Sequence, residues 1–380
     1  MKKTLCCSVN SLCNTEGLFN DELKEILIDI AERYGLFIYS GDKEKKLLLP
    51  EELQSYFKEV DRSIIKNGEL LKKSFIEFGT SKKDYVILGS TDNDFFLSNH
   101  SNVLLLAAFW SNMDQKIEKY GLRIKSPFAL KYFFDNVLKI QEPWYYKVNI
   151  NDNAVIYSLM SSNTMYTKND DIKEINNQFN QLLKKGDTSF IQLIKYYFVC
   201  ALNIIEDIDK VDLWTYYPSS DDSNNPILEE FSETSRYLFG TTRKKHPLFI
   251  RHKNSEKRHY LNKEQRLKLA CNSQFDTIHL NPRFKEQVKD KIICIIDDYS
   301  TYGSSSETAR ILLEKAGARK VIFITFGKFG FGNNYNKFEY EINGDIFTNN
   351  YKYNKLNHEI INGETIDNSH EIIETLKVMI

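Results

Sequence analysis

The sequence lacks the cysteine and histidine patterns that mark disulfide-rich and zinc-binding proteins. Its six cysteines include no CxxC pair, and no Cys/His cluster has the spacing of a zinc site. We therefore interpret the cysteines as reduced thiols of a cytoplasmic protein. The motifs HExxH, GxSxG and the Walker-type phosphate loop are absent too, so the usual sequence signatures of zinc proteases, α/β-hydrolases and P-loop nucleotidases are excluded.

Long apolar runs and an excess of one charge are also missing. No stretch is long enough to span a membrane, and polar residues interrupt the short apolar stretch near the N-terminus. We read residues 4–10 as a strand rather than as a signal peptide. The 51 Lys and Arg residues nearly balance the 52 Asp and Glu residues, so the chain as a whole has no excess of positive charge for binding polyanions. A local basic patch is compatible with this balance.

The sequence does contain a regular alternation of apolar runs and amphipathic helical patterns, which is typical of α/β proteins. With 380 residues and 42% apolar content, the chain is long enough for more than one core. We predict an α/β protein of two domains, residues 1–140 and 141–380. Each domain is expected to contain a mainly parallel sheet flanked by helices.

Individual elements follow from the period of the apolar residues. In the first domain we predict strands at 4–10, 36–40, 84–90 and 103–110, a helix at 20–34 and two helices within 50–78. In the second domain we predict strands at 144–150, 154–160, 212–220 and 246–253, and helices at 170–186, 189–208 and 229–240. A basic loop at 254–270 and an Asn- and Tyr-rich region with a closing helix, 331–380, complete the second domain.

The most informative stretch is IICIIDDYSTYGSSSETARILLEKAGARKVIFITFG, residues 292–327. An apolar run, typical of a strand buried on both faces, ends in Asp297 and Asp298, and a hydroxyl-rich loop with Gly303 leads into a helix. Ligands of open α/β sheets bind beyond the carboxyl ends of the strands. Helix N-terminal amides and hydroxyls suit a phosphate, and two carboxylates suit sugar hydroxyls, directly or through a hard divalent cation. The stretch therefore predicts a sugar-phosphate site; the alternative is an ordinary strand-turn-helix with Asp and Ser as caps.

This stretch resembles the phosphoribosyl-pyrophosphate motif of type I phosphoribosyltransferases, in which four apolar and two acidic residues precede a Thr/Gly-rich loop and a helix. The resemblance implies that Asp297 and Asp298 are the catalytic pair, which faces the ribose 2′- and 3′-hydroxyls and holds Mg²⁺. It also implies a loop for the 5′-phosphate, formed by Thr301, Tyr302, Gly303, Ser304 and Ser305. Tyr302 stands where that family usually has a second threonine, so it adds a ring beside the phosphate.

Other parts of the C-terminal half fit the same resemblance. DLWTYYPSS resembles the family's first strand and its pyrophosphate-side loop, with Ser219 and Ser220 at the tip. The basic stretch that follows resembles the lid that closes over pyrophosphate, and it supplies Arg251, Lys253 and Arg258. A solvated surface is the alternative for this stretch. The order of the parts most resembles the competence-type (ComF-like) branch, although the Arg-Gly-Phe-Asn stretch of that branch is absent after Ser220.

The N-terminal half resembles a haloacid-dehalogenase-like (HAD-like) phosphatase domain. VILGSTDNDFFLSN, residues 86–99, resembles its metal-binding fourth motif through Asp92 and Asp94. LFIYSG resembles the second motif, with Ser40 in the phosphate-binding place, and Lys82 or Lys83 resembles the family's lysine. The alternative for the two aspartates is a polar loop after a strand.

The first motif of that phosphatase family is broken in this chain. Ser8 and Asn10 stand where an aspartate nucleophile is needed, and neither supplies a carboxylate to attack phosphorus or to bind Mg²⁺. We expect no phosphatase activity from this domain, and instead a role in ligand sensing or docking.

These features predict a protein that binds phosphoribosyl pyrophosphate, or a related ribose phosphate, with Mg²⁺ and transfers ribose phosphate to an unidentified acceptor. The alternative is a catalytically inactive nucleotide or sugar-phosphate sensor or scaffold, with a role in DNA uptake or defence suggested by the family context alone. We further expect a homo-oligomer without a membrane segment, and nucleic acid or a partner protein as a further partner.

Overall fold

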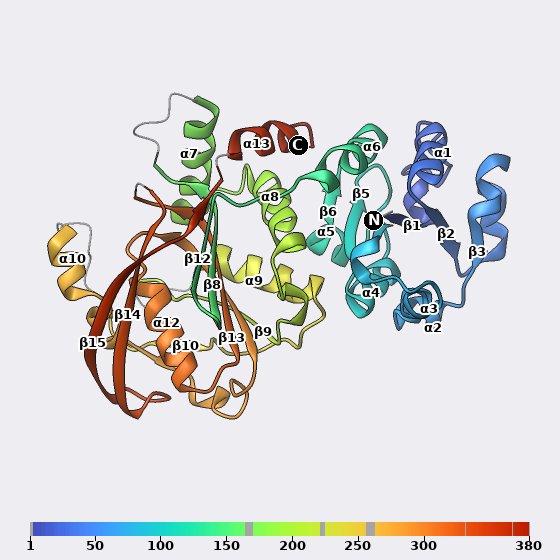
Figure 1. The fold of residues 1–380 in the computed structure, drawn as a ribbon. Coiled ribbons are helices and arrows are strands. Elements are labelled where there is room, and N and C mark those ends of the chain that lie inside the picture. Colours follow the sequence, from blue (N-terminus) through green and yellow to red (C-terminus); the bar gives the residue numbers. More distant parts are fainter. Residues whose placement is uncertain are drawn as a thin grey trace. The chain divides into compact units, whose positions relative to one another are not determined.

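The computed structural model describes residues 3–163, 170–220, 225–255, 263–330, 332–366 and 368–379. The chain divides into two compact units. Unit 1 comprises Met1–Gln141, Tyr237–Gly240 and Glu374–Ile380; unit 2 comprises Glu142–Arg236 and Thr241–Ile373. The predicted fold class is confirmed, because each unit is built on a six-stranded sheet with helices beside it (Figure 1). Within the described ranges, no helix combines the length and the apolar character needed to cross a bilayer.

The sheet of unit 1 is parallel throughout, in the order β3-β2-β1-β4-β5-β6. Its strands are β1 Thr4–Ser8, β2 Leu36–Ser40, β3 Phe57–Glu59, β4 Tyr85–Gly89, β5 Leu104–Ala108 and β6 Leu122–Ile124. The strand order reverses between β1 and β4, and such a reversal opens a crevice at the carboxyl ends of the two strands. The short strands β3 and β6 were not predicted, because three residues give no readable period.

The strands of unit 1 are connected by α1 Leu23–Arg33, α2 Arg62–Lys66, α3 Glu69–Phe78, α4 Asp92–Ser101 and α5 Gln115–Tyr120, and α6 Pro127–Asp135 follows β6. The helix predicted at 20–34 is present as α1, and it buries Leu23, Leu27 and Ile30, which share one face. Helix α6 begins where Ser126 accepts a hydrogen bond from the amide of Ala129, with proline at the first helical position.

The main sheet of unit 2 has the order β16-β7-β8-β13-β12-β9. Its strands are β7 Tyr146–Asn151, β8 Ala154–Ser161, β9 Leu213–Tyr216, β12 Ile292–Ser300, β13 Lys320–Lys328 and β16 Glu364–Thr365. The four strands from β8 to β9 are parallel, and β7 and β16 add an antiparallel edge. Residues 292–296 of β12 are all buried, as expected for a central parallel strand. Strands β10 Phe249–Arg251 and β11 Ile278–Leu280 form a separate antiparallel pair.

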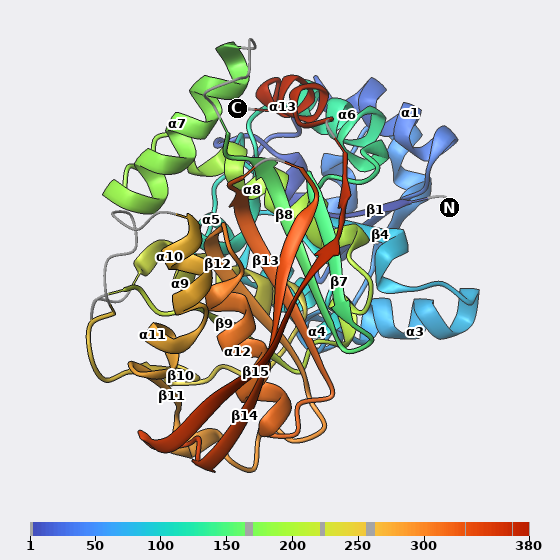
Figure 2. The ribbon, with the colours of Figure 1, turned by 60° about the vertical axis from the view of Figure 1, so that its left-hand side comes forward.

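Helices cover both faces of this sheet (Figure 2). The helices in this half of the chain are α7 Asp170–Lys185, α8 Ile191–Ile204, α9 Pro226–Leu238, α10 Lys263–Leu269, α11 Asn272–Phe275 and α12 Ser304–Lys315, and α13 spans Ser369–Lys377 near the C-terminus. On one face Phe326 of β13 packs between Phe179, Phe198 and Phe231, with ring centroids 4.8–5.8 Å away. These aromatic contacts tie α7, α8 and α9 to the central strands.

A long hairpin in the Asn- and Tyr-rich region was not predicted. Strands β14 Asn334–Asp345 and β15 Asn350–Asn362 pair along their whole length and lie beside α12 (Figures 1 and 2). In β14 the buried residues Tyr335, Phe338 and Ile342 are three and four positions apart, and β15 is mostly exposed. Parts of both segments nevertheless alternate as strands do. Phe338, Tyr340 and Ile342 of β14 are separated by exposed glutamates, and Tyr351 and Tyr353 of β15 are separated by exposed Lys352, so a usable strand signal was present.

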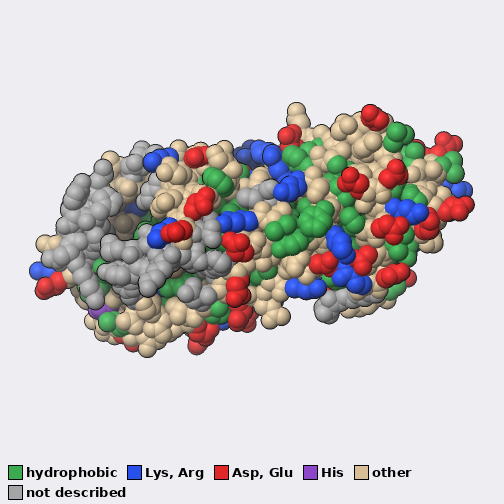
Figure 3. Space-filling view, turned by 90° about the horizontal axis from the view of Figure 1, so that it is seen from above, with side chains coloured by type: hydrophobic (Ala, Val, Ile, Leu, Met, Phe, Trp, Pro, Cys, Tyr) green, Lys and Arg blue, Asp and Glu red, His purple; other side chains and the backbone are tan. Residues whose placement is uncertain are grey.

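Acidic and basic side chains are interspersed on the face shown in Figure 3, in keeping with the net charge of −1. Among the described residues of that face, no broad field of one sign is visible.

Candidate functional site

A pocket of about 460 Å³ lies at the carboxyl end of β12. The predicted acidic pair and the predicted phosphate loop line it together; these residues are Asp297, Asp298, Thr301, Tyr302, Gly303, Ser304 and Ser305. A neighbouring pocket of about 220 Å³ shares both aspartates and extends to Ser219, Ser220 and Arg251. The structure thus brings the motif of β12 and the tip of the loop after β9 to one place.

One predicted lid residue, Lys253, lies away from the pockets, and another falls outside the described residues. Lys253 is exposed and lines neither pocket. Arg258 lies outside the described residues. The expectation of a basic lid over the pocket therefore has no support from the described part of the chain.

The acidic pair lies within a strand rather than at its tip. Strand β12 continues to Ser300, since Asp297 pairs with Thr325 and Tyr299 pairs with Gly327 on β13. The prediction ended the strand at the first aspartate because apolar residues end there. The neighbouring strand β13 is equally long, however, and its backbone extends the ladder past the polar residues.

Helix α12 begins at Ser304, within the hydroxyl-rich stretch that was predicted to be the phosphate loop. Gly303 precedes it with a φ of 77°, a left-handed conformation that favours glycine. A Cβ on Gly303 would lie 2.8 Å from the ring of Tyr335, so the position also has no room for a side chain. Ser304, Ser305 and Ser306 form the first turn of the helix, where backbone amides have no intrahelical acceptor. The predicted loop therefore ends at Gly303, and the serines add helix amides to the pocket wall.

The two carboxylates are close enough to influence each other. Burial and the neighbouring charge of Asp298 raise the pKa of Asp297 well above its usual range. The amide of Asp298 donates to Asp297 Oδ1 at 2.9 Å, and the amide of Tyr299 donates to Asp298 Oδ1 at 2.6 Å. Both hydrogen bonds fix the carboxylates on the strand. The arrangement favours either a shared proton or a cation between the two groups.

Arg251 has a bracing role in the structure. It is the last residue of β10, it is buried, and its guanidinium donates to Ser219 O, to Thr277 Oγ1 at 2.6 Å and to Gln274 Oε1 at 3.0 Å. Tyr217 also donates to Gln274 Oε1, at 2.9 Å. Arg251 thus ties the loop after β9 to α11, and its charge counteracts the rise in the pKa of Asp297.

Several pocket residues were not predicted from the sequence. They are Gln274, Tyr299, Ser300, Ser306, Phe323, Thr325 and Phe329. Tyr299 packs on Phe329 with ring centroids 4.9 Å apart and donates to Asn180 Oδ1 on α7 at 2.7 Å. The position of Tyr299 directly after the acidic pair was a usable signal. Gln274 comes from α11, far away in the sequence, and no local pattern points to it.

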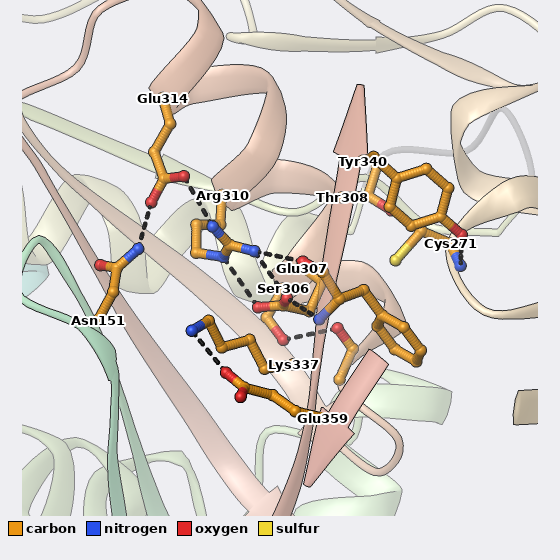
Figure 4. A network of polar contacts seen from close by, with 12 residues as sticks. Asn151, Cys271, Ser306, Glu307, Thr308, Arg310, Glu314, Lys337, Tyr340 and Glu359 are labelled. Carbon is orange, nitrogen blue, oxygen red and sulfur yellow. Dashed lines mark hydrogen bonds and ion pairs between the residues drawn. The ribbon is translucent and has the colours of Figure 1, made fainter. Parts of the chain in front are cut away.

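Glu307, in the first turn of α12, is a core residue (Figure 4). Its carboxylate accepts from the Arg310 guanidinium at 2.8 and 3.0 Å, from Tyr335 Oη at 3.0 Å and from the amide of Phe338 at 2.7 Å. This network joins the start of α12 to β14 beneath the Gly303 turn. Tyr302 does line the pocket.

The donor set of the pocket fits a hard divalent cation only in part. Asp297 and Asp298 offer carboxylate oxygens, which Mg²⁺ prefers. Nowhere in the described ranges do three or more His, Cys, Asp or Glu side chains come together to hold a metal ion. A magnesium ion held by this pair would therefore take its remaining ligands from water and from a bound phosphate or sugar.

In unit 1 the residues of the predicted phosphatase motifs lie around Asp94. Its Oδ2 accepts from Ser8 Oγ, the amides of Ser90 and Thr91, and Thr91 Oγ1, and its Oδ1 accepts from Tyr39 Oη at 2.7 Å. Asp94 is buried and completes the capping box of α4, whose N-cap residue is Thr91. This carboxylate is committed to protein donors.

Of the other predicted motif residues, some lie at a small pocket beside Asp94 and others do not. Asp92 forms an ion pair with Lys116 at 2.7 Å. Asn10 and Ser40 line a small pocket together with Asp94. Lys82 and Lys83 lie in the 3₁₀ turn before β4 and do not line that pocket.

Comparison of the chain with protein-family models, with curated proteins and with solved structures finds no match. The resemblances to phosphoribosyltransferases and to HAD-like phosphatases therefore stay predictions.

Proposed function

We propose that unit 2 binds phosphoribosyl pyrophosphate, or a related ribose phosphate, together with Mg²⁺ and transfers the ribose phosphate to an acceptor. The observation that carries this proposal is the 460 Å³ pocket, in which Asp297 and Asp298 lie beside the Thr301–Gly303 turn and the N-terminus of α12. A phosphate suits the amides and hydroxyls of that turn. The two carboxylates suit adjacent sugar hydroxyls.

The second pocket supports a longer, polyphosphorylated ligand. It continues from the acidic pair to Ser219 and Ser220, so a ligand that spans both pockets carries groups on either side of the carboxylates. Arg251 braces this side of the site through Ser219 and Gln274. The residues from β10, β12 and the loop after β9 thus favour a ligand with a phosphate at each end of a sugar.

In the proposed reaction the acceptor's lone pair forms a bond to C1 of the ribose. The bond from C1 to the pyrophosphate oxygen breaks, its electron pair leaves with pyrophosphate, and the acceptor proton passes to water. Asp297 and Asp298 hold the ribose and stabilise the positive charge that develops on the ring. Bound Mg²⁺ would neutralise charge on the leaving pyrophosphate.

A catalytically inactive ribose-phosphate sensor is the second candidate. Tyr302 lines the phosphate side of the pocket, where its ring takes up space, and Arg251 is committed to protein acceptors. Both observations favour binding without transfer. A further expected partner, nucleic acid, would show itself by DNA binding that weakens steeply with salt.

Release of pyrophosphate in an acceptor screen separates the two candidates. The full chain is incubated with phosphoribosyl pyrophosphate, Mg²⁺ and nitrogenous acceptors, and pyrophosphate is measured. We expect acceptor-dependent release that Asp297→Asn and Asp298→Asn abolish. Asp276→Asn is the matched control, because Asp276 lines neither pocket and accepts from Tyr353 Oη. Ligand binding without release for any acceptor would favour the sensor.

A further inference from the structure

Gln274 is a pocket residue that the motif of β12 does not supply. It belongs to α11, is only 7% exposed, and lines both pockets of unit 2 together with Asp297 and Asp298. Tyr299 and Ser305 are the other residues common to the two pockets. The side chain of Gln274 therefore lies where the two pockets meet, beside the acidic pair.

Two donors fix the orientation of the Gln274 amide. Its Oε1 accepts from the Arg251 guanidinium at 3.0 Å and from Tyr217 Oη at 2.9 Å. A guanidinium can only donate hydrogen bonds, so an amide turned the other way would bring its NH₂ group against Arg251. Oε1 therefore faces Arg251, and both hydrogens of Nε2 point away from the guanidinium.

Helix α11 is itself held in place by the β14–β15 hairpin. Tyr340 Oη donates to Asn272 Oδ1 at 2.7 Å, and Tyr351 Oη donates to the carbonyl of Phe275 at 2.8 Å. These hydrogen bonds hold the helix on both sides of Gln274. The position of the Gln274 side chain is thus set before any ligand binds, which lowers the entropy cost of binding.

The two hydrogens of Gln274 Nε2 have no acceptor among the residues that the structure describes. A buried amide with unpaired hydrogens costs free energy, and such groups in native proteins usually meet water or a ligand. The nitrogen is not fully enclosed, so a group in the pocket can reach it. Gln274 thus presents two unused donors at the junction of the pockets.

The neighbouring carboxylates decide which ligand group suits these donors. Asp297 and Asp298 accept hydrogen bonds, whereas Gln274 Nε2 donates them. A hydroxyl meets both needs, because it has one donor hydrogen and two acceptor lone pairs. A phosphate oxygen also accepts, but it would bring negative charge against the two carboxylates. The junction of the pockets therefore suits a sugar hydroxyl.

We propose that Gln274 determines the specificity of the site for ribose over deoxyribose. Its Nε2 donates to a ring hydroxyl, and the same hydroxyl donates to the acidic pair. The inference rests on the proposed ribose-phosphate function and adds to it the residue that recognises the sugar. A deoxy sugar leaves the buried Gln274 donor unpaired, so it binds more weakly.

Calorimetric titration of the full chain with Mg²⁺ tests this by comparing ribose 5-phosphate with its 2-deoxy and 3-deoxy forms. We expect the wild type to bind ribose 5-phosphate at least about tenfold more tightly than one of the two deoxy sugars. Gln274→Glu keeps an acceptor for Arg251 and Tyr217 but removes both donors, and Gln274→Met removes the donors without adding charge. In both variants the ratio of affinities should fall at least about threefold, because one hydrogen bond to the sugar is lost.

The ratio compares ligands with the same phosphate, so the added charge of Gln274→Glu cancels from it. Gln287→Glu is the matched control, because Gln287 lines neither pocket and its Oε1 likewise accepts from a cation, Lys244, at 2.7 Å. This control should keep the wild-type ratio. Equal ratios in the wild type and in both Gln274 variants would overturn the role of Gln274 alone. Absence of ribose 5-phosphate binding by folded wild type would overturn that role together with the proposed function.

Discussion

We expect loss of the buried ion pair between Glu307 and Arg310 to lower the unfolding free energy of unit 2 strongly. Arg310→Met removes the guanidinium while keeping a long apolar side chain. Glu307, with no exposed surface, keeps two of its donors, Tyr335 Oη and the amide of Phe338, but loses its counter-charge. The carbonyl of Phe338, which now accepts from Arg310 at 2.8 Å, also loses its donor.

Breaking a buried pair on one side costs about 3–5 kcal/mol of unfolding free energy, because a charge is left in a low-dielectric interior. The matched control is Lys337→Met, which breaks the nearby Lys337–Glu359 pair on the β14–β15 hairpin (Figure 4). Those side chains are 21% and 44% exposed. Solvent screening reduces the expected cost there to about 0.2–1 kcal/mol.

Urea unfolding followed by tryptophan fluorescence measures both costs. In a Trp110→Phe background the remaining tryptophans, Trp144 and Trp214, both belong to unit 2 and are buried. Their signal therefore follows the unit that contains the pair. Equal midpoints for Arg310→Met and Lys337→Met would refute the conclusion that Glu307 is a buried, charge-paired residue.

Three further predictions concern the pocket. Because the pKa of Asp297 is raised, the native state keeps a proton that the unfolded chain loses near 3.8, so this group's contribution to stability falls as pH rises above that value. Asp297→Asn should therefore stabilise unit 2 at neutral pH by about 0.5–2 kcal/mol, with a gain in thermal midpoint that shrinks toward pH 4; a gain independent of pH would contradict this. Gly303→Ala should cost about 1–3 kcal/mol from backbone strain, and more than Gly317→Ala, whose φ is 84° but whose Cβ would meet nothing closer than 3.5 Å. Similar urea midpoints for the two alanine variants would show that the contact with Tyr335 is unimportant. Arg251→Met should lower the unfolding free energy by about 2 kcal/mol and weaken ribose-phosphate binding, because Ser219 O and Thr277 Oγ1 lose the Arg251 donor and Gln274 Oε1 keeps only Tyr217; full binding by the folded variant would refute the bracing role of Arg251.

The core of the site could be predicted because its residues are adjacent in the sequence. The apolar run 292–296, the acidic pair and the glycine turn are parts of one strand-turn-helix segment. The residues that follow a buried parallel strand lie at the carboxyl ends of the strands, where ligands of such sheets bind. The same reasoning located the central strands of both sheets. Apolar runs of five residues bounded by polar turns mark buried strands directly.

The ends of the strands and helices were harder to predict, because they depend on contacts with neighbouring segments. The serines 304–306 favour caps and turns when they are read locally, yet the left-handed Gly303 starts the helix before them. Strand β12 passes through its aspartates because β13 continues beside it. A single strand or helix does not contain this information.

Long-range partners could not be predicted at all. Gln274 reaches the pocket from α11, and Arg251 is bonded to residues 23, 26 and 32 positions away. The contact of the β14–β15 hairpin with Glu307 leaves no local signal either, although the alternation at residues 338–342 marks β14 itself as a strand. These features arise from packing between segments distant in the chain.

Calorimetric titration of phosphoribosyl pyrophosphate into the full chain, with and without Mg²⁺, measures directly whether the pocket beside Asp297 and Asp298 binds a ribose phosphate. We expect saturable, Mg²⁺-dependent binding by the wild type that Asp297→Asn/Asp298→Asn loses while staying folded. Asp276→Asn, with its carboxylate outside both pockets, should bind as the wild type does. No binding by folded wild type, or equal binding by the double variant, would contradict the assignment of the acidic pair on β12 to a ribose-phosphate site.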